Sequence, residues 1–407
     1  MKQLFLIGVA GLALVAGTRA RALQDRPAPI FRSAVDLVAV DVQVVAGNGE
    51  PVDGLNLDDF EVFFNGQPRR IVSVDFIRKL PLPSPEDGGP ERPIVTPGVV
   101  PPGARVFVLA IDSSSFSAAT IKPAMQAAEA FLRQLQPDDI VGLYIYPFER
   151  PAVNFTHDHF SVQRALGRVV GQLEPFNGTF HLSPSEAIDI QADDGEILRR
   201  AVARECRGED SACPESLHME AIAQTGYYET QGMVGLRGVS LLLRGLATLP
   251  GRKTVVLLSG GLIDGNRPGS RSNLGGFMMT VGAEAGAAES NLYVVHLDTS
   301  FFDPFSASAA SVRDPSARVR SAPRDEYMLG VGLERLAGVS GGTFLHVQAG
   351  TGAPALSRVL RESSAYYLLG VQPVSADRDG KLHFLRVKVK KRGVAVRSRT
   401  HVVIPRK

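Results

Sequence analysis

A carboxylate and a cluster of hydroxyls follow an apolar run between Arg105 and Ser117, which reads RVFVLAIDSSSFS. The run breaks at Asp112, and four serines follow within five residues. A continuous apolar run is typical of a strand buried on both faces of a parallel sheet. Asp112 and Ser114 form an Asp-x-Ser pattern of oxygen ligands, which hard cations such as Mg²⁺ and Ca²⁺ prefer. We therefore predict a candidate cation site at the end of this strand.

Two more acids are expected near the same edge. Asp264 follows Gly260 by four residues, and Asp298 ends the predicted strand 292–297. Parallel strands place their carboxyl ends on one side of a sheet, so both acids could converge with Asp112 into a cation site. The alternative is that Asp112 and Asp298 only cap loops or helix N-termini through backbone N–H groups.

Ser259 follows the predicted strand 254–259, as the nucleophile of a hydrolase would. The pattern LSGG lacks the glycine two residues before the serine that a nucleophile elbow requires. No histidine and acid are convincingly placed to complete a triad. We therefore expect no enzyme, with a hydrolase that uses Ser259 as an alternative.

The chain has two cysteines, Cys206 and Cys213, in a polar stretch. In an oxidising compartment, a disulfide that closes this short loop is the favoured interpretation, and two free thiols are the alternative. A metal site would need more cysteine or histidine, and only His218 is nearby.

Composition indicates an exported globular protein. The 407 residues are 44% hydrophobic and 21% charged, which suggests two or three soluble domains. Residues 1–22 are typical of a secretory signal peptide, with Lys2, a short apolar core and an A-x-A site at residues 20–22. We expect a secreted or periplasmic protein, with an uncleaved membrane anchor as the alternative. The formal charge of +2 falls near zero after cleavage, which argues against nucleic-acid binding.

The remaining elements divide the chain into a β unit, a linker and an α/β domain. Residues 31–78 alternate apolar and polar positions and predict a small β unit. Residues 79–104 are a proline-rich linker. Strands and helices alternate over residues 105–365, which predicts a doubly wound, mainly parallel sheet. Residues 366–407 predict further strands without helices, which could complete the β unit.

Within the α/β region, we expect a helix over residues 186–206 and a buried helix over residues 233–249. The closing strands carry Arg386, Lys388 and Lys390 on one face, and Arg397 and Arg399 add to the charge. Contact with a membrane or a cell-wall polymer is one interpretation. A solvated face of an antiparallel sheet with a charge-protected edge is the other.

Four segments together resemble the von Willebrand factor A-related secreted proteins known chiefly from acidobacteria. The resemblance runs from about residue 31 to the C-terminus. It implies a von Willebrand A-type core over residues 105–365, with Asp112 beside the strand that ends at Ser259. The four segments are VDLVAVDVQVV with GLNLDDFEVFFNGQPRRI, QLQPDDIVGLYIY, LATLPGRKTVVLLSGGL, and SSAYYLLGVQP with DGKLHFLRVKVKKRGVAVRSRT.

The resemblance also implies a degenerate metal-ion-dependent adhesion site. Such domains hold Mg²⁺ with Asp-x-Ser-x-Ser, a threonine on a second loop and an aspartate after a later strand. This chain keeps Asp112 and Ser114, and Thr179 is the residue that would match the threonine. Phe116 replaces the second serine, and Gly260 stands where the aspartate is expected. Mg²⁺ demands near-ideal octahedral oxygen geometry, so we expect this site to hold Mg²⁺ poorly, whereas Ca²⁺, with its looser geometry, could occupy a rebuilt site.

We therefore predict a secreted or periplasmic, non-catalytic protein-binding module for adhesion or assembly. The alternative is a cation-dependent adhesin with a site rebuilt from Asp112, Asp264 and Asp298. The residues expected to form the partner surface are Ser115, Phe116, Ser259 and Gly260, with apolar area from Phe301, Phe302 and Phe305.

Overall fold

The computed structural model describes residues 37–78, 105–147, 152–206, 211–264, 274–299, 315–348 and 352–406. The predicted signal peptide (residues 1–22) and linker (residues 79–104) lie outside these residues, as do Phe301, Phe302 and Phe305. The described residues contain one six-stranded and one seven-stranded sheet.

The six-stranded sheet has the order β6-β5-β4-β7-β8-β9. Neighbouring strands are parallel, except that β6 is antiparallel to β5. All seven residues of β4 are buried, which explains their continuous apolar sequence. The predicted α/β class with a mainly parallel sheet is confirmed. The strands are β4 (Val106–Asp112), β5 (Ile140–Tyr146), β6 (Val153–Thr156), β7 (Lys253–Ser259), β8 (Ser290–Asp298) and β9 (Thr343–Gln348).

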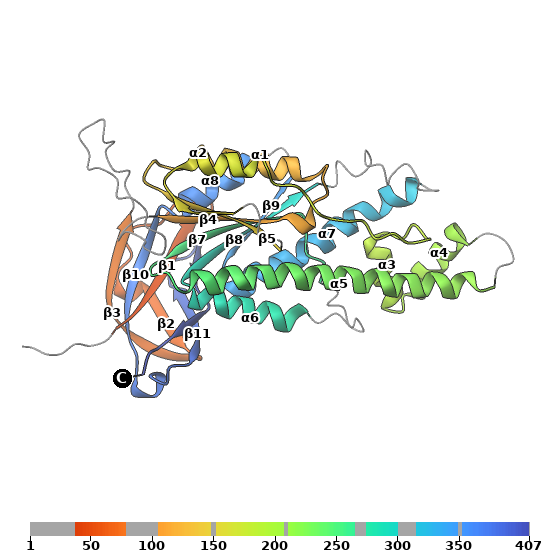
Figure 1. The fold of residues 1–407 in the computed structure, drawn as a ribbon. Coiled ribbons are helices and arrows are strands. Elements are labelled where there is room, and N and C mark those ends of the chain that lie inside the picture. Colours follow the sequence, from red (N-terminus) through yellow and green to blue (C-terminus); the bar gives the residue numbers. More distant parts are fainter. Residues whose placement is uncertain are drawn as a thin grey trace, which may run out of the picture. The chain divides into compact units, whose positions relative to one another are not determined.

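Helices pack on both faces of this sheet (Figure 1). One core contains residues of α1, α2 and α8, and the other contains residues of α5, α6 and α7. Alternate positions of the central strands contribute to the two cores, as expected for a sheet buried on both sides. The bounds are α1 (Ile121–Leu132), α2 (His159–Leu166), α5 (Cys213–Leu246), α6 (Leu274–Ala287), α7 (Pro315–Ser340) and α8 (Gly352–Glu362).

The direction of winding reverses between β4 and β7. From β4, the chain adds β5 and β6 on one side, and then returns to add β7, β8 and β9 on the other. The carboxyl ends of the two strands at such a reversal border the crevice in which open α/β sheets bind ligands. Asp112 and Ser259 are the last residues of these two strands.

The seven-stranded sheet is antiparallel and combines strands from both ends of the described chain. Its order is β12-β1-β10-β3-β2-β11-β13, with β10 between β1 and β3. Its core contains valines of β1, phenylalanines of β2 and apolar residues of β10. The strands are β1 (Val38–Ala46), β2 (Phe60–Phe64), β3 (Gln67–Arg78), β10 (Ala365–Gln372), β11 (Leu382–Val389), β12 (Val394–Ser398) and β13 (His401–Val403).

Buried polar contacts join this sheet to the α/β part. The Gln43 side chain on β1 donates from Nε2 to the Glu362 carbonyl at 2.8 Å and accepts from Asn291 Nδ2 at 2.6 Å. Arg397 on β12 contacts the fully buried Glu362 carboxylate at 2.5 Å. Arg399 pairs with Glu289 at 3.3 Å. The two arginines therefore serve internal contacts, and the expectation that they add to an exposed basic face is wrong.

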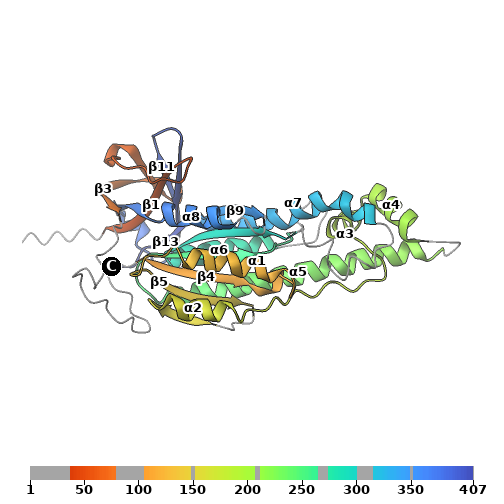
Figure 2. The ribbon, with the colours of Figure 1, turned by 90° about the horizontal axis from the view of Figure 1, so that it is seen from above.

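A helical annex lies between α2 and β7 in the sequence. It consists of α3 (Pro184–Gln191), α4 (Gly195–Glu205) and the N-terminal half of α5. The single helix expected over residues 186–206 is interrupted because Asp193 has a positive φ of 63° and Asp194 caps α4. Both views place α3 and α4 beside the start of α5 (Figure 1, Figure 2). Cys206 and Cys213 form a disulfide there, with Cα atoms 5.8 Å apart.

Candidate functional site

Five side chains form a row across the parallel sheet near its carboxyl edge. The strand register pairs Tyr146 with Asp112, Ser259 with His296, and His296 with His346. Ile111 pairs with Leu258, so the next residues, Asp112 and Ser259, are also neighbours. Residues in register on adjacent parallel strands point to the same face. We call Tyr146, Asp112, Ser259, His296 and His346 the polar row.

The polar row lies on the face covered by α5, α6 and α7. The residues two positions earlier in β4, β7 and β8 are Ala110, Leu257 and Val294, and all belong to the core on that face. Tyr146, Asp112, Ser259 and His296 are each no more than 8% exposed. Buried polar side chains in a core must find partners or leave hydrogen bonds unmade. The two ends of the row meet this demand differently.

At the first end, hydroxyl groups satisfy both oxygens of the Asp112 carboxylate. Ser114 Oγ donates to Oδ1 at 2.7 Å, and Ser259 Oγ donates to Oδ2 at 3.0 Å. Ser115 Oγ donates to the Asp112 carbonyl at 2.9 Å and accepts from the Gly260 N–H at 2.7 Å. Burial raises the pKa of Asp112 to about 6, although the hydrogen bonds from Ser114 and Ser259 oppose this shift.

The backbone of α5 covers this end closely. A Cβ atom at Gly238 would lie 2.7 Å from Tyr146 Cβ, and one at Gly235 would lie 3.8 Å from Asp112 Oδ2. The close approach requires glycine at position 238, whereas a Cβ at position 235 would make an ordinary van der Waals contact. The carboxylate is therefore enclosed by its own loop, by β7 and by α5.

Of the predicted ligands, Ser114 contacts Asp112, but Thr179, Asp264 and Asp298 do not gather around it. Thr179 lies in the annex, where its N–H donates to Glu220 Oε2 at 2.7 Å. Gln172, and not Thr179, lies beside the Asp112 loop. Its N–H donates to the Ser113 carbonyl at 2.8 Å. Asp264 pairs with Arg335 at 2.6 Å. Asp298 lies beside Glu326. The three acids expected to converge thus have separate partners.

The residues expected to form the partner surface are not exposed, so that expectation is wrong. Phe116 and Ser259 are 0% exposed, and Gly260 is buried as well. The Phe116 ring belongs to the core under α1, because the loop turns it inward after Ser115. Ser115 is half-buried, with its hydroxyl used internally. These four residues therefore pack inside the edge of the sheet and do not form an exposed surface.

At the other end of the row, histidines and acids meet. The Nε2 atoms of His296 and His346 lie 3.6 and 3.0 Å from the same Glu326 oxygen, Oε1, which α7 supplies. Burial lowers the pKa of His296 to about 4. Burial and the neighbouring charge of Asp298 raise the pKa of Glu326 to about 7. The His346 side chain is 48% exposed, so this end reaches solvent.

The sequence analysis missed this second end. One signal was present, because His296 and His346 each fall inside a predicted strand of the parallel sheet. Two such histidines become neighbours only when the strands pair in one particular register. Glu326 gives no comparable signal, since its place depends on the packing of α7.

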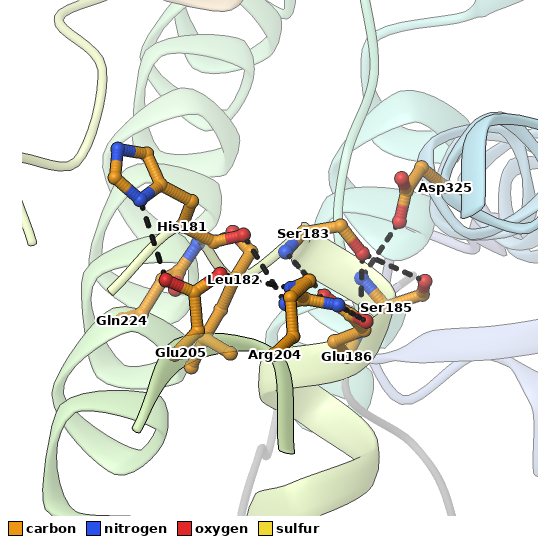
Figure 3. A network of polar contacts seen from close by, with 9 residues as sticks. All are labelled: His181, Leu182, Ser183, Ser185, Glu186, Arg204, Glu205, Gln224 and Asp325. Carbon is orange, nitrogen blue, oxygen red and sulfur yellow. Dashed lines mark hydrogen bonds and ion pairs between the residues drawn. The ribbon is translucent and has the colours of Figure 1, made fainter. Parts of the chain in front are cut away.

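The annex has its own small core and a polar network. Its core includes Leu182, Ala187, Ile190, Ala201, Leu217 and Ala221. Figure 3 shows Arg204 between Glu186 and Glu205, with contacts of 2.7 and 2.8 Å. Burial alone would raise the pKa of Glu205, but Arg204 outweighs it and holds the pKa below its usual value. The annex is therefore a folded extension and no loose loop.

Contacts to α7 hold the annex above the carboxyl edge of the sheet. The Ser185 N–H donates to Asp325 at 2.8 Å (Figure 3). Arg324 pairs with the buried Asp189 at 2.5 Å. Because Asp325 immediately precedes Glu326, the annex and the histidine end of the row share one segment of α7. Met219 and Ile222, on the annex half of α5, are 55% and 40% exposed.

The basic face of β11 is exposed at Arg386, Lys388 and Lys390. Lys388 is opposite Glu61 in the sheet and lies over the Phe63 ring at 5.2 Å. Contact of this face with a membrane or cell-wall polymer stays a prediction. Among the described residues, the helices are too short or too polar to span a bilayer.

Comparisons with known proteins add little. No protein-family model matches the chain, and no curated protein matches it in sequence. Among solved structures, the crystal structure of the SpRpn10 VWA domain is similar over 62% of this chain and 94% of that one, with 8% identity and a TM-score of 0.26. A likeness of this strength supports no conclusion about function.

Proposed function

We propose that this protein is an exported, non-catalytic protein-binding module of the von Willebrand A type, with a degenerate metal-ion-dependent adhesion site. The reversal of strand order between β4 and β7 supports this architecture. It puts Asp112 and Ser259 where open α/β sheets border their ligand crevice. The partner binds at the annex that rises beside this edge.

The enclosure of Asp112 carries the proposal that partner recognition is independent of Mg²⁺. Both carboxylate oxygens accept hydrogen bonds from serine hydroxyls, at 2.7 and 3.0 Å. Gly260 offers no carboxylate to replace the aspartate expected at that position. A cation would have to displace these hydrogen bonds in a buried site with a single carboxylate, and Mg²⁺ gives up its water reluctantly. The rebuilt site of Asp112, Asp264 and Asp298 is disfavoured because Asp264 is paired with Arg335.

The same geometry argues against a hydrolase that uses Ser259. Its hydroxyl donates directly to the Asp112 carboxylate, without a histidine between the two. A serine nucleophile needs a base that can take its proton and access to substrate. Ser259 is 0% exposed. Its role is to hold Asp112 in place.

The annex supplies the partner surface. Its own core and the Cys206–Cys213 disulfide hold it in one conformation, and a disulfide is typical of exported proteins. Met219 and Ile222 present apolar side chains to solvent on a rigid helix. Such side chains are common anchors for a protein partner.

Cross-linking in the producing cells tests this function. The tagged full chain should retain the same partner in EDTA, and Met219→Glu should reduce recovery at least about tenfold. Leu241→Glu is the matched control, because Leu241 is on the same helix and is 54% exposed, against 55% for Met219. A partner that is lost in EDTA, or that tolerates Met219→Glu, would contradict the proposal.

A further inference from the structure

The histidine end of the polar row carries an inference independent of the proposed binding function. His296, Glu326 and His346 each offer a ligand atom, and these atoms all lie within 4.8 Å of one another. We propose that these three residues bind a divalent transition-metal ion of the zinc class, with Asp298 or water completing the coordination.

The strand register makes this grouping a property of the fold. His296 and His346 are direct partners on the parallel strands β8 and β9, and their ring centroids are 5.2 Å apart. Asp298 is two residues after His296 and points to the same face. Helix α7 brings Glu326 to both rings, and it packs tightly at Gly330, where a Cβ would lie 3.2 Å from His296 Nδ1. Two strands and one helix thus supply the ligands.

The donor set selects the class of metal. Two imidazole nitrogens with one or two carboxylates suit Zn²⁺ and related ions, which form four-coordinate sites with such ligands. Mg²⁺ and Ca²⁺ prefer oxygen ligands throughout and would gain little from the histidines. The predicted hard-cation site at Asp112 and this one therefore differ in chemistry as well as in place.

The hydrogen bonding of His296 is a second, independent observation. Its side chain is 1% exposed, and Nδ1 has no hydrogen-bond partner among the described residues. Nε2 lies 3.2 Å from the Gly260 carbonyl as well as near Glu326. The carbonyl oxygen only accepts, so Nε2 carries the ring proton in the metal-free protein; metal binding would shift that proton to the unpartnered Nδ1 and expose the Nε2 lone pair.

The charges and the access also fit a cation. Glu326 and Asp298 are neighbouring carboxylates, whose negative charges repel each other. A bound divalent cation would offset that repulsion. His346 is 48% exposed and Glu326 is 17% exposed, so an ion can enter from solvent on the His346 side.

Zinc titration of the metal-stripped full chain tests the site. Calorimetry near neutral pH should show one equivalent of Zn²⁺ bound. His346→Ala and Glu326→Gln should each weaken the affinity about 100-fold or more, since even residues outside the coordination shell change it 10–100-fold. Co²⁺ in place of Zn²⁺ should give the visible absorption bands of nitrogen and oxygen ligands, and these bands should be lost in both variants.

His181→Ala is the matched control. His181 also pairs with a single carboxylate, that of Glu205 at 3.5 Å, and should leave Zn²⁺ affinity unchanged. Circular dichroism verifies the fold of every variant, and Glu326→Gln keeps the size of the side chain if His346→Ala is disturbed. Absence of stoichiometric binding, or equal affinity in wild type and both ligand variants, would leave only an ion pair and overturn the proposal.

Discussion

The two ends of the polar row have the same strand register but opposite relations to solvent. At the Asp112 end, Ser114 and Ser259 use both carboxylate oxygens, and α5 covers the group. At the His346 end, two imidazoles and Glu326 converge beside a side chain that is 48% exposed. The end with the recognisable motif is closed, and the end without one is open.

This difference teaches that a ligand pattern is insufficient without free lone pairs. Serine hydroxyls are short, and within the Asp112 loop they reach the carboxylate themselves. The protein thereby satisfies the buried acid internally, as buried polar groups require. At the other end, the Nε2 atoms of His296 and His346 lie 3.6 and 3.0 Å from the same oxygen of the Glu326 carboxylate, which α7 supplies.

The largest expected effect concerns the packing of α7 over the histidine end. Gly332 faces the backbone of the loop that follows β7. A Cβ at this position would lie 2.0 Å from the Leu262 carbonyl oxygen. Gly332→Ala should therefore lower the free energy of unfolding by about 3 kcal/mol, because a backbone group must move. It should also weaken Zn²⁺ binding, since Glu326 is on the same helix. Denaturant titration and calorimetry measure the two effects.

Gly338→Ala is the control for that experiment. Gly338 is in the same helix, and a Cβ there would meet nothing within 4 Å. The same substitution should stabilise the protein by up to about 1 kcal/mol, because alanine favours helix over glycine. Equal stability of the two variants would show that α7 does not depend on this close approach.

The next effect is a pH dependence confined to the Asp112 end. The folded protein holds the pKa of Asp112 at about 6, against 3.8 for the free side chain, because the carboxyl is buried. The folded state therefore resists ionisation. Wild type should lose stability as pH rises from about 4 to about 6, by about 2–3 kcal/mol from this residue.

Asp112→Asn cannot ionise and should lack that loss. Its unfolding free energy, measured by denaturant titration between pH 4 and pH 7 (about the window of this titration), should fall less steeply than that of wild type. Other groups titrate in both proteins, so the difference between them is the quantity of interest. Parallel curves would mean that Asp112 is already ionised at low pH and that its enclosure is looser than the geometry indicates.

Local sequence predicted the sheet and one end of the row. The strand β4 can be recognised from its apolar run, because a strand buried on both faces needs apolar side chains throughout. Parallel strands indicated that Asp112 lies at the carboxyl edge, whereas its place beside the strand that ends at Ser259 was implied by the resemblance. Exposure could not be predicted, since whether Phe116 faces solvent or core depends on one turn after Ser115.

The histidine end and the annex depend on longer-range packing. His296 and His346 are 50 residues apart in sequence, and only the pairing of β8 with β9 makes them neighbours. Thr179 was matched to the second-loop threonine through the resemblance, whereas Glu220 on α5 accepts from its N–H. The first half of α5 is polar around Cys213 and gives little helical periodicity. Its helical form is stabilised by the annex core and by α3.

The smallest expected effect is the response to Mg²⁺. A ligand that binds only the folded state raises the melting temperature by mass action. Zn²⁺ should therefore stabilise wild type, whereas Mg²⁺ at about 5 mM should change the melting temperature by less than about 1 °C. The reason is that Mg²⁺ would have to break the hydrogen bonds of Ser114 and Ser259 to reach Asp112. A Mg²⁺-dependent rise that Asp112→Asn abolishes would show that the motif end opens, and the contrast between the two ends would then be one of metal preference alone.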